Sequence, residues 1–140
     1  MPCLEVSMPR TNQKTKRLLT ARLTEVFVSC TDFSAHSLGI RYWEYNLGQA
    51  ANEGRLWDGQ TGKPYLHLVL HSPRMRGTQK QKLIEALTSA FVECVGKPDW
   101  KPVIFLSEYP YDNVGVDGRP ISQGFEEYAG KKFYYQLPDD

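Results

Sequence analysis

Hydrophobic and polar positions alternate along the chain with two different periods. Between Cys3 and Ser7 apolar and polar residues alternate, and this period of two residues predicts a strand with two distinct faces. Residues 40–44 predict a second strand. Between the two strands a helical period predicts a helix, with an apolar stripe at Leu19, Leu23, Val26, Phe27 and Cys30.

The same order of strand, helix and strand returns in the second half of the chain. Residues 66–71 alternate as the first strand does, and residues 103–106 predict a closing strand. Between them Thr78 and Gln81 have the spacing of a capping box at a helix start, and Gly96 marks the end of the helix. This predicted helix has an apolar stripe at Ile84, Leu87, Phe91, Cys94 and Val95.

A shift of 64 positions aligns the two segments with each other. The chain is then identical to itself at 13 of the 42 positions from 4 to 45, and no gap is needed. Such self-similarity indicates one supersecondary unit used twice. The identical pairs are Leu4/Leu68, Pro9/Pro73, Arg10/Arg74, Lys16/Lys80, Leu19/Leu83, Leu23/Leu87, Thr24/Thr88, Phe27/Phe91, Val28/Val92, Cys30/Cys94, Ile40/Ile104, Glu44/Glu108 and Tyr45/Tyr109.

Each copy is a β-α-β unit, and the helical crossover makes its two strands parallel. Two such units predict an α+β fold with a four-stranded mixed sheet and both helices on one face. The other face then needs a cover, which favours an oligomer. We expect a single domain over residues 1–140, with repeat 1 at about 2–46, repeat 2 at about 65–109 and a C-terminal segment at 110–140.

The segments outside the repeats have distinct compositions. Residues 46–63 are rich in Gly and Gln and predict a loop or a small hairpin. The tail from 109 to 140 carries several glycines and tyrosines. Its aromatic content is not typical of a disordered tail, and we expect it to pack over a neighbouring surface.

Composition narrows the classes of function. Apolar residues make up 41% of the 140 residues and charged residues 24%, which excludes a typical disordered chain. A net charge of +1 argues against binding to a nucleic-acid backbone, and no apolar stretch approaches the ~20 residues of a membrane span. The three cysteines are widely spaced without a metal-ligand pattern, so we expect reduced thiols, no metal and a cytoplasmic protein.

Pro2 is the first candidate for chemistry. Initiator methionine is usually removed before a small second residue, and removal of Met1 would leave Pro2 as a secondary amine at the chain terminus. Such an amine titrates near neutral pH, and burial disfavours its charged form. A buried Pro2 with a free nitrogen could therefore act as a general base near pH 7.

Pro2, the duplicated β-α-β unit and two cationic loops together resemble the tautomerase superfamily, which uses an N-terminal proline as its catalytic group. The chain length and C-terminal segment look most like the fused, double-length members, the cis-3-chloroacrylic acid dehalogenases and malonate semialdehyde decarboxylases. The resemblance implies a homotrimer whose subunits cover the open sheet face, and we expect no cofactor. The loops, each opening a predicted helix, are Arg10-Thr11-Asn12-Gln13 and Arg74-Met75-Arg76-Gly77-Thr78-Gln79-Lys80.

Arginine suits a planar carboxylate because its guanidinium offers parallel donors in a fixed geometry. Arg74 and Arg76 match the paired arginines that bind the substrate carboxylate in these members of the family. Arg10 occupies the equivalent place in the first repeat. The resemblance therefore implies a small keto acid or unsaturated acid as substrate, with Pro2 transferring a proton or supporting hydration.

The chain departs from the family at the remaining catalytic positions. Phe27 stands where the dehalogenases have a histidine, Phe105 where they have a tyrosine, and their glutamate falls near Val116. The aspartate of the decarboxylases falls at Ala35. Asp117 is the candidate for a water-activating acid, although Asp-Gly is also ordinary turn chemistry. The alternative hypothesis is a catalytically impaired protein that uses the same scaffold for binding.

Overall fold

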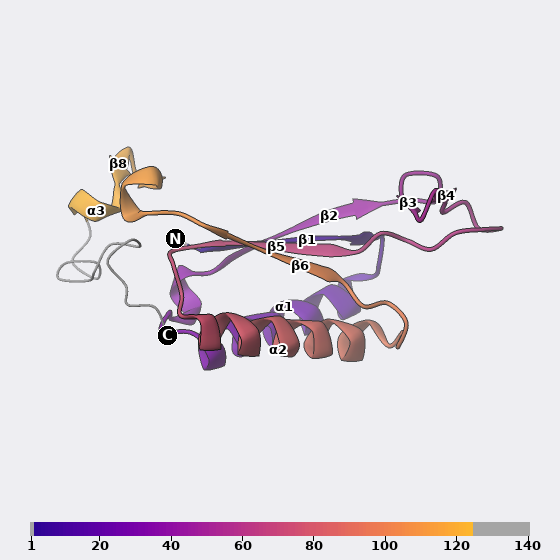
Figure 1. Ribbon diagram of the computed structural model, residues 1–140, viewed down its shortest axis with the longest axis horizontal. Coiled ribbons are helices and arrows are strands. Elements are labelled where there is room, and N and C mark those ends of the chain that lie inside the picture. Colours follow the sequence, from indigo (N-terminus) through magenta and orange to yellow (C-terminus); the bar gives the residue numbers. More distant parts are fainter. Residues whose placement is uncertain (1, 125–140) are drawn as a thin grey trace.

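The computed structural model describes residues 2–124 in two layers, one of strands and one of helices (Figure 1). The first repeat consists of β1 (Cys3–Pro9), α1 (Gln13–Cys30), the short 3-10 helix η1 (Ala35–Ser37) and β2 (Gly39–Tyr45). The second repeat consists of β5 (His67–Ser72), α2 (Gly77–Val95) and β6 (Val103–Glu108).

The main sheet has the strand order β2-β1-β5-β6. Strands β1 and β2 are parallel, as are β5 and β6, because each pair is joined by a helical crossover. The two repeats meet through the antiparallel pair β1 and β5, in which Leu4 lies opposite Leu70 and Val6 opposite Leu68. The predicted mixed sheet of two β-α-β units is therefore confirmed.

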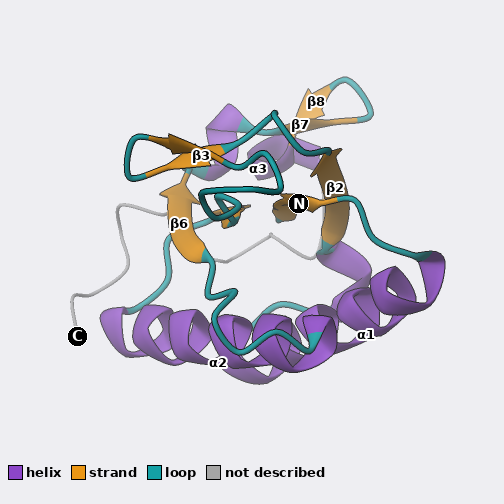
Figure 2. Cartoon of the chain, turned by 90° about the vertical axis from the view of Figure 1, so that its right-hand side faces the viewer, coloured by secondary structure: helices purple, strands orange, loops and turns teal. Residues whose placement is uncertain are grey.

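Both helices cover the same face of the sheet (Figure 2). Alternate residues of the central strands point into this layer, and Leu4, Val6, Leu68 and Leu70 are each at most 1% exposed. Helix α1 contributes Leu19, Leu23, Val26 and Phe27 to this core, and α2 contributes Leu83, Leu87, Ala90 and Phe91. The two apolar stripes read from the sequence thus form the helical side of one core.

The two helices begin at different kinds of cap. At α1 the Asn12 side chain accepts a hydrogen bond from the Thr15 N–H at 2.7 Å. At α2 the cap lies two residues before the predicted Thr78, because the Gln79 side chain accepts from the backbone N–H of Arg76 at 3.0 Å. The predicted capping box of Thr78 and Gln81 is therefore wrong, and the extended loop ends at Arg76.

Each repeat contains the same carboxylate contacts at the end of its second strand. Glu44 bonds the Lys16 ammonium at 2.7 Å and accepts from the Thr11 N–H at 2.8 Å. Glu108 bonds Lys80 at 2.5 Å and accepts from the Met75 N–H at 3.2 Å. The glutamate thus ties the strand–helix loop to the neighbouring strand in both repeats.

The connecting segments form small structures outside the main core. The predicted hairpin between the repeats is present as β3 (Ala51–Asn52) and β4 (Arg55–Leu56). After β6, the 3-10 helix η2 (Tyr111–Asn113), the hairpin β7 (Gly115–Val116) and β8 (Arg119–Pro120), and α3 (Ile121–Gly124) form a separate cluster around Tyr111 and Ile121. The rest of the tail, 125–140, lies outside the described residues.

The face of the sheet opposite the helices carries a mixture of apolar and charged side chains. Trp43, Val103 and Phe105 are each 45–49% exposed there. In the centre Glu5 bonds His71 at 3.2 Å. Within residues 2–124, no helix is long and apolar enough to cross a membrane.

The Glu44 contacts generate a prediction about stability and pH. Burial disfavours the ionised carboxyl, but the bonds from Lys16 and Thr11 outweigh this penalty and lower its pKa below the usual 4.5. The stabilisation is therefore present above about pH 4.5 and is lost as the pH falls through the lower pKa of the folded state. Glu44→Gln should reduce the free energy of unfolding at pH 7 by about 1–3 kcal/mol.

Urea unfolding at fixed protein concentration, at pH 7 and pH 3, would check this. The difference between Glu44→Gln and the parent should shrink as the pH falls from 7 toward 3, because the parent progressively loses the ionised carboxylate. Glu25→Gln is the control, because the Glu25 side chain is 69% exposed and its ion pair with Arg22 contributes little. An equal loss at both pH values would contradict the role given to the ionised Glu44.

Candidate functional site

Pro2 lies at the end of the central strand β1 and is buried. Its carbonyl accepts a hydrogen bond from the Gly39 N–H at 3.1 Å, which continues the pairing of β1 with β2. On the other side Cys3 lies opposite His71, so continuing the antiparallel register by one residue places Pro2 beside Ser72. The start of the first repeat is thus next to the end of β5.

The loop that follows β5 brings Arg74 and Arg76 to this same end of the sheet. Met75 between them is only 3% exposed, whereas Arg74 is half-buried and Arg76 is exposed. This alternation is what an extended segment produces, because residues two apart point to the same side. The Glu108 carboxylate holds the loop by accepting a hydrogen bond from the Met75 N–H. Because the Met75 side chain points into the core, the guanidinium groups of Arg74 and Arg76 point away from it.

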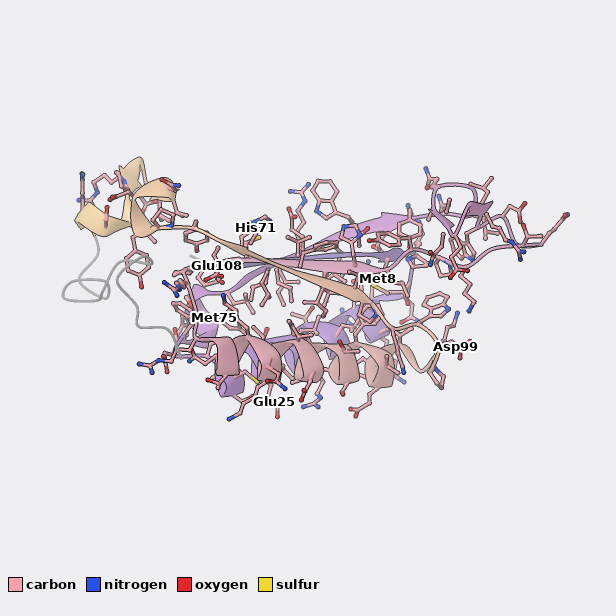
Figure 3. The ribbon with its side chains drawn as sticks, viewed as in Figure 1. Met8, Glu25, His71, Met75, Asp99 and Glu108 are labelled. Carbon is pink, nitrogen blue, oxygen red and sulfur yellow. The ribbon has the colours of Figure 1, made fainter. Side chains whose placement is uncertain are left out.

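Figure 3 shows the two ends of the sheet. Met75 and Glu108 lie at the end that carries the N-terminus in Figure 1, and Met8 lies toward the opposite end. Arg74, Arg76 and Glu108 at the Pro2 end therefore come from the second repeat. A negatively charged substrate at this end would meet a buried proline and two arginines carried by one loop.

Arg10 lies at the opposite end of β1 from Pro2 within one chain. Seven residues of strand lie between them, so eight steps of about 3.3 Å put them roughly 26 Å apart. The Arg10 Nε–H donates to the Asn46 side chain at 3.2 Å, and its N–H donates to the Tyr45 carbonyl at 2.9 Å. The predicted substrate-binding set of Arg10, Arg74 and Arg76 is thus not assembled by a single chain.

Asp117 lies in the turn of the β7–β8 hairpin, near the Pro2 end of the sheet (Figure 1). Its φ of 55° and the 79° of Gly118 give both central residues of the two-residue turn positive φ values, as a type I′ turn requires. The side chain is exposed. Its backbone conformation explains the Asp-Gly pair without any catalytic role, and its role in catalysis stays a prediction.

Two positions that differ from the dehalogenases have clear structural roles. Phe27 is 1% exposed in the core and stacks on Phe33 with the ring centroids 5.9 Å apart. Phe105 lies on the open face of the sheet and contacts the His67 ring edge-on at 6.1 Å. Neither position offers a proton donor or acceptor, so chemistry at the Pro2 end depends on other residues.

The sequence reasoning missed three polar residues at the Pro2 end. Glu108 and Lys80 hold the arginine-bearing loop, and the repeat alignment signalled them through their identity with Glu44 and Lys16. Ser72 is the third, with 0% exposure. Its only signal was a difference between the repeats, because the equivalent position in the first repeat is Met8.

The fold and this end of the sheet define an α+β protein of two β-α-β repeats in which Pro2 is buried beside a cationic loop. Residues 64–124 match the family model described as Tautomerase, tautomerase enzyme. No curated protein sequence matches the chain.

Solved structures share the fold over most of the chain. The crystal structure of native fused 4-OT is 21% identical with a TM-score of 0.78, covering 85% of this chain and 95% of that one. A symmetric trimer of a wild-type fused 4-OT is 18% identical with a TM-score of 0.68, covering 85% and 95%. N1, a member of the cis-3-chloroacrylic acid dehalogenase family, is 19% identical with a TM-score of 0.68, covering 97% and 92%.

The resemblance read from the sequence is therefore confirmed. Residues 64–124 match the tautomerase family model, and the fold of the chain is that of the fused 4-OT structures.

The arginine-bearing loop generates a prediction about substrate binding. Arg74→Ala and Arg76→Ala should each raise KM for a small keto acid roughly tenfold to a hundredfold, because a hydrogen bond between charged groups contributes about 1.5–3 kcal/mol. Arg74→Lys should also bind poorly, because an ammonium cannot replace a bidentate guanidinium.

Steady-state kinetics with phenylpyruvate, together with thermal unfolding, would check this. Arg17→Ala is the control, because Arg17 is an exposed arginine on α1. Arg76 is exposed at the start of α2, so its replacement should leave the melting temperature nearly unchanged. If KM and kcat stay at parent values in both alanine variants, the two arginines do not bind substrate.

Proposed function

We propose that this chain is an enzyme that transfers a proton on a small carboxylated substrate, with the free Pro2 amine as its acid–base group after removal of Met1. The observation that carries the proposal is the antiparallel pairing of β1 with β5. It puts the start of β1 next to the loop with Arg74 and Arg76. An acid–base group and a carboxylate anchor therefore belong to the same end of one chain.

A keto acid is the substrate class that this pair of groups suits best. The keto and enol forms differ by one proton, which is on carbon in the first form and on oxygen in the second. A mildly basic amine can remove the proton from carbon and return it to oxygen, and arginine can hold the carboxylate meanwhile. Such a transfer needs neither the histidine nor the tyrosine that the dehalogenases have.

A second reaction that the same site could support is the hydration of an unsaturated acid. It requires a group that activates water, and Asp117 is the candidate acid near this end of the sheet. The exposed position of Asp117 in a type I′ turn gives this reaction weaker support than proton transfer.

The alternative hypothesis is that the chain is not an enzyme but a catalytically impaired protein that binds a ligand on the same scaffold. The apolar side chains at Phe27 and Phe105 favour it, because they stand at positions where the dehalogenases carry catalytic groups. On this hypothesis Arg74 and Arg76 would bind a carboxylate without turnover. Binding of phenylpyruvate without loss of its enol would support the alternative over the enzyme.

We also propose that the chain forms a homotrimer through the open face of the sheet. A fused 4-OT with the same fold forms a symmetric trimer. Trp43, Val103 and Phe105 are half-exposed on that face, and contact with other subunits would remove their apolar surface from water. A trimer would also bring the Arg10 end of one subunit within reach of the Pro2 end of another.

Activity should depend on a free Pro2 nitrogen. Retention of Met1 makes this nitrogen a tertiary amide whose lone pair is delocalised, so it can no longer accept a proton. Processed protein should accelerate the loss of phenylpyruvate enol, and protein that retains Met1 should not, although both fold. Pro2→Ala is a weaker test because it leaves a primary amine.

Ultraviolet absorbance would follow the enol across a pH series, with circular dichroism as the check on folding. The rate should rise through the pKa of the amine if Pro2 is the base and fall through it if Pro2 is the acid. Equal rates for the free and blocked proteins would overturn the proline mechanism.

Sedimentation equilibrium should give about three times the chain mass of 16.0 kDa. Phe105→Glu should dissociate the assembly, because it would bury three like charges in the interface. Glu53→Gln on the β3–β4 turn is the control, since Glu53 lies away from the main sheet. A monomer at micromolar concentration for the parent chain would contradict the trimer.

A further inference from the structure

Ser72 carries a polar group for which the described part of the chain offers no partner. The residue is 0% exposed, and its Oγ makes no hydrogen bond with residues 2–124. A buried hydroxyl without a partner costs roughly 1–3 kcal/mol in stability. The position is therefore one where a further polar group is expected.

The Ser72 side chain points to the same face of the sheet as Pro2. In β5 the helix-covered positions are Leu68, Leu70 and Ser72, and in β1 they continue from Leu4 back to Pro2. Cys3 pairs with His71, so Pro2 and Ser72 are the next cross-strand neighbours. Opposed side chains on one face of an antiparallel pair have Cβ atoms about 4.5–5.5 Å apart.

The other repeat shows what this position holds when no chemistry is needed. The alignment by 64 residues makes Met8 the counterpart of Ser72, and Leu66 the counterpart of Pro2. Continuing the same register at the far end of the sheet makes Met8 and Leu66 neighbours, and they are 1% and 5% exposed. One end of the sheet thus pairs two apolar side chains, and the other pairs a buried hydroxyl with the N-terminal residue.

We propose that Ser72 is the hydrogen-bond partner of the free Pro2 amine, with its Oγ accepting an N–H from the protonated nitrogen. The inference rests on the proposed function only in requiring that Met1 is removed. A hydrogen bond to a charged donor is stronger than one to a neutral donor. Ser72 therefore favours the protonated amine, raises its pKa and fixes the direction of its second N–H.

Other ionisable groups at this end also act on the amine. Cys3 and His71 lie on the opposite face of the sheet, so the sheet separates them from the amine. The titratable or charged groups on the surrounding segments are Asp32 after α1, His36 of η1, Arg74 and Arg76 of the loop, Lys80 of α2, Glu108 of β6, Tyr109 after it, and Tyr111, Asp112, Asp117 and Arg119 of the C-terminal cluster. All of them stay the same in Ser72 variants, so a difference in pKa reports the hydroxyl.

The first experiment measures whether the hydroxyl and the amine stabilise each other. Ser72→Ala is made in processed protein and in protein that retains Met1, and melting temperatures are compared. With a free amine, Ser72→Ala should lower the melting temperature by roughly 2–8 °C. With Met1 attached, the nitrogen has no N–H to donate, so the same change should leave the melting temperature unchanged or raise it.

The control is a second buried serine at the same end of the molecule. Ser37 is 6% exposed, and its Oγ donates to the Ser34 carbonyl at 2.8 Å. Ser37→Ala should therefore lower the melting temperature equally in both forms of the chain. Equal effects of Ser72→Ala in the two forms would overturn the proposal, because they would show that the amine is not the partner.

The second experiment measures the pKa of the Pro2 amine. In processed protein labelled with ¹⁵N-proline, the Pro2 nitrogen is followed by NMR across pH. Ser72→Ala should lower the pKa of the amine, and Ser72→Cys should lower it as well, because a thiol of similar size is a weak acceptor. Ser37→Ala should leave it unchanged.

An unaltered pKa in both Ser72 variants would overturn the proposal. Neither measurement requires turnover, so the proposal about Ser72 can fail while the enzyme proves active. The proposal about Ser72 can also hold if the protein has no catalytic activity.

Discussion

The structure depends on the antiparallel pairing of β1 with β5 at the centre of the sheet. Each repeat alone is a two-stranded parallel unit with one helix, too small to bury its apolar face well. The central pair joins the two cores into one and relates the repeats by an approximate twofold axis. It also places the start of each repeat beside the end of the other, so Pro2 of the first meets the arginine loop of the second.

The two repeats share the same strand–helix–strand scaffold, but they differ in the residues at the two ends of the β1–β5 pair. Glu44 with Lys16, and Glu108 with Lys80, hold the strand–helix loops in the same way at opposite ends of the sheet. A salt bridge with a backbone hydrogen bond thus sets where each loop starts its helix. The pair of residues beside each loop differs between the two ends. Met8 and Leu66 complete an apolar core at one end, whereas the buried Ser72 and Pro2 are neighbours at the other.

The open face of the sheet is the surface through which the proposed trimer would form. Its exposed large apolar side chains lie on the outer strands, with Trp43 on β2 and Val103 and Phe105 on β6, and the Glu5–His71 pair lies between them. Arg41 lies over the Trp43 ring at 4.3 Å. A face of this kind offers both apolar contact and charge to a second copy, and Arg10, remote from Pro2 in one chain, is the residue whose role depends most on such a copy.

The sequence by itself determined the repeats, the strand and helix periods, the mixed sheet and the resemblance to the tautomerase superfamily, because identity at 13 positions and two clear periods are local signals. It also supplied Pro2, Arg74 and Arg76 as candidates. It misplaced the cap of α2, because the bond from Gln79 to the Arg76 N–H competes with the Thr78 spacing and wins. Only the tertiary structure put the buried Ser72 and the arginine-bearing loop at the Pro2 end of the sheet. This placement follows from strand register, which is set by pairing between residues about 70 positions apart and therefore leaves no local pattern in the chain.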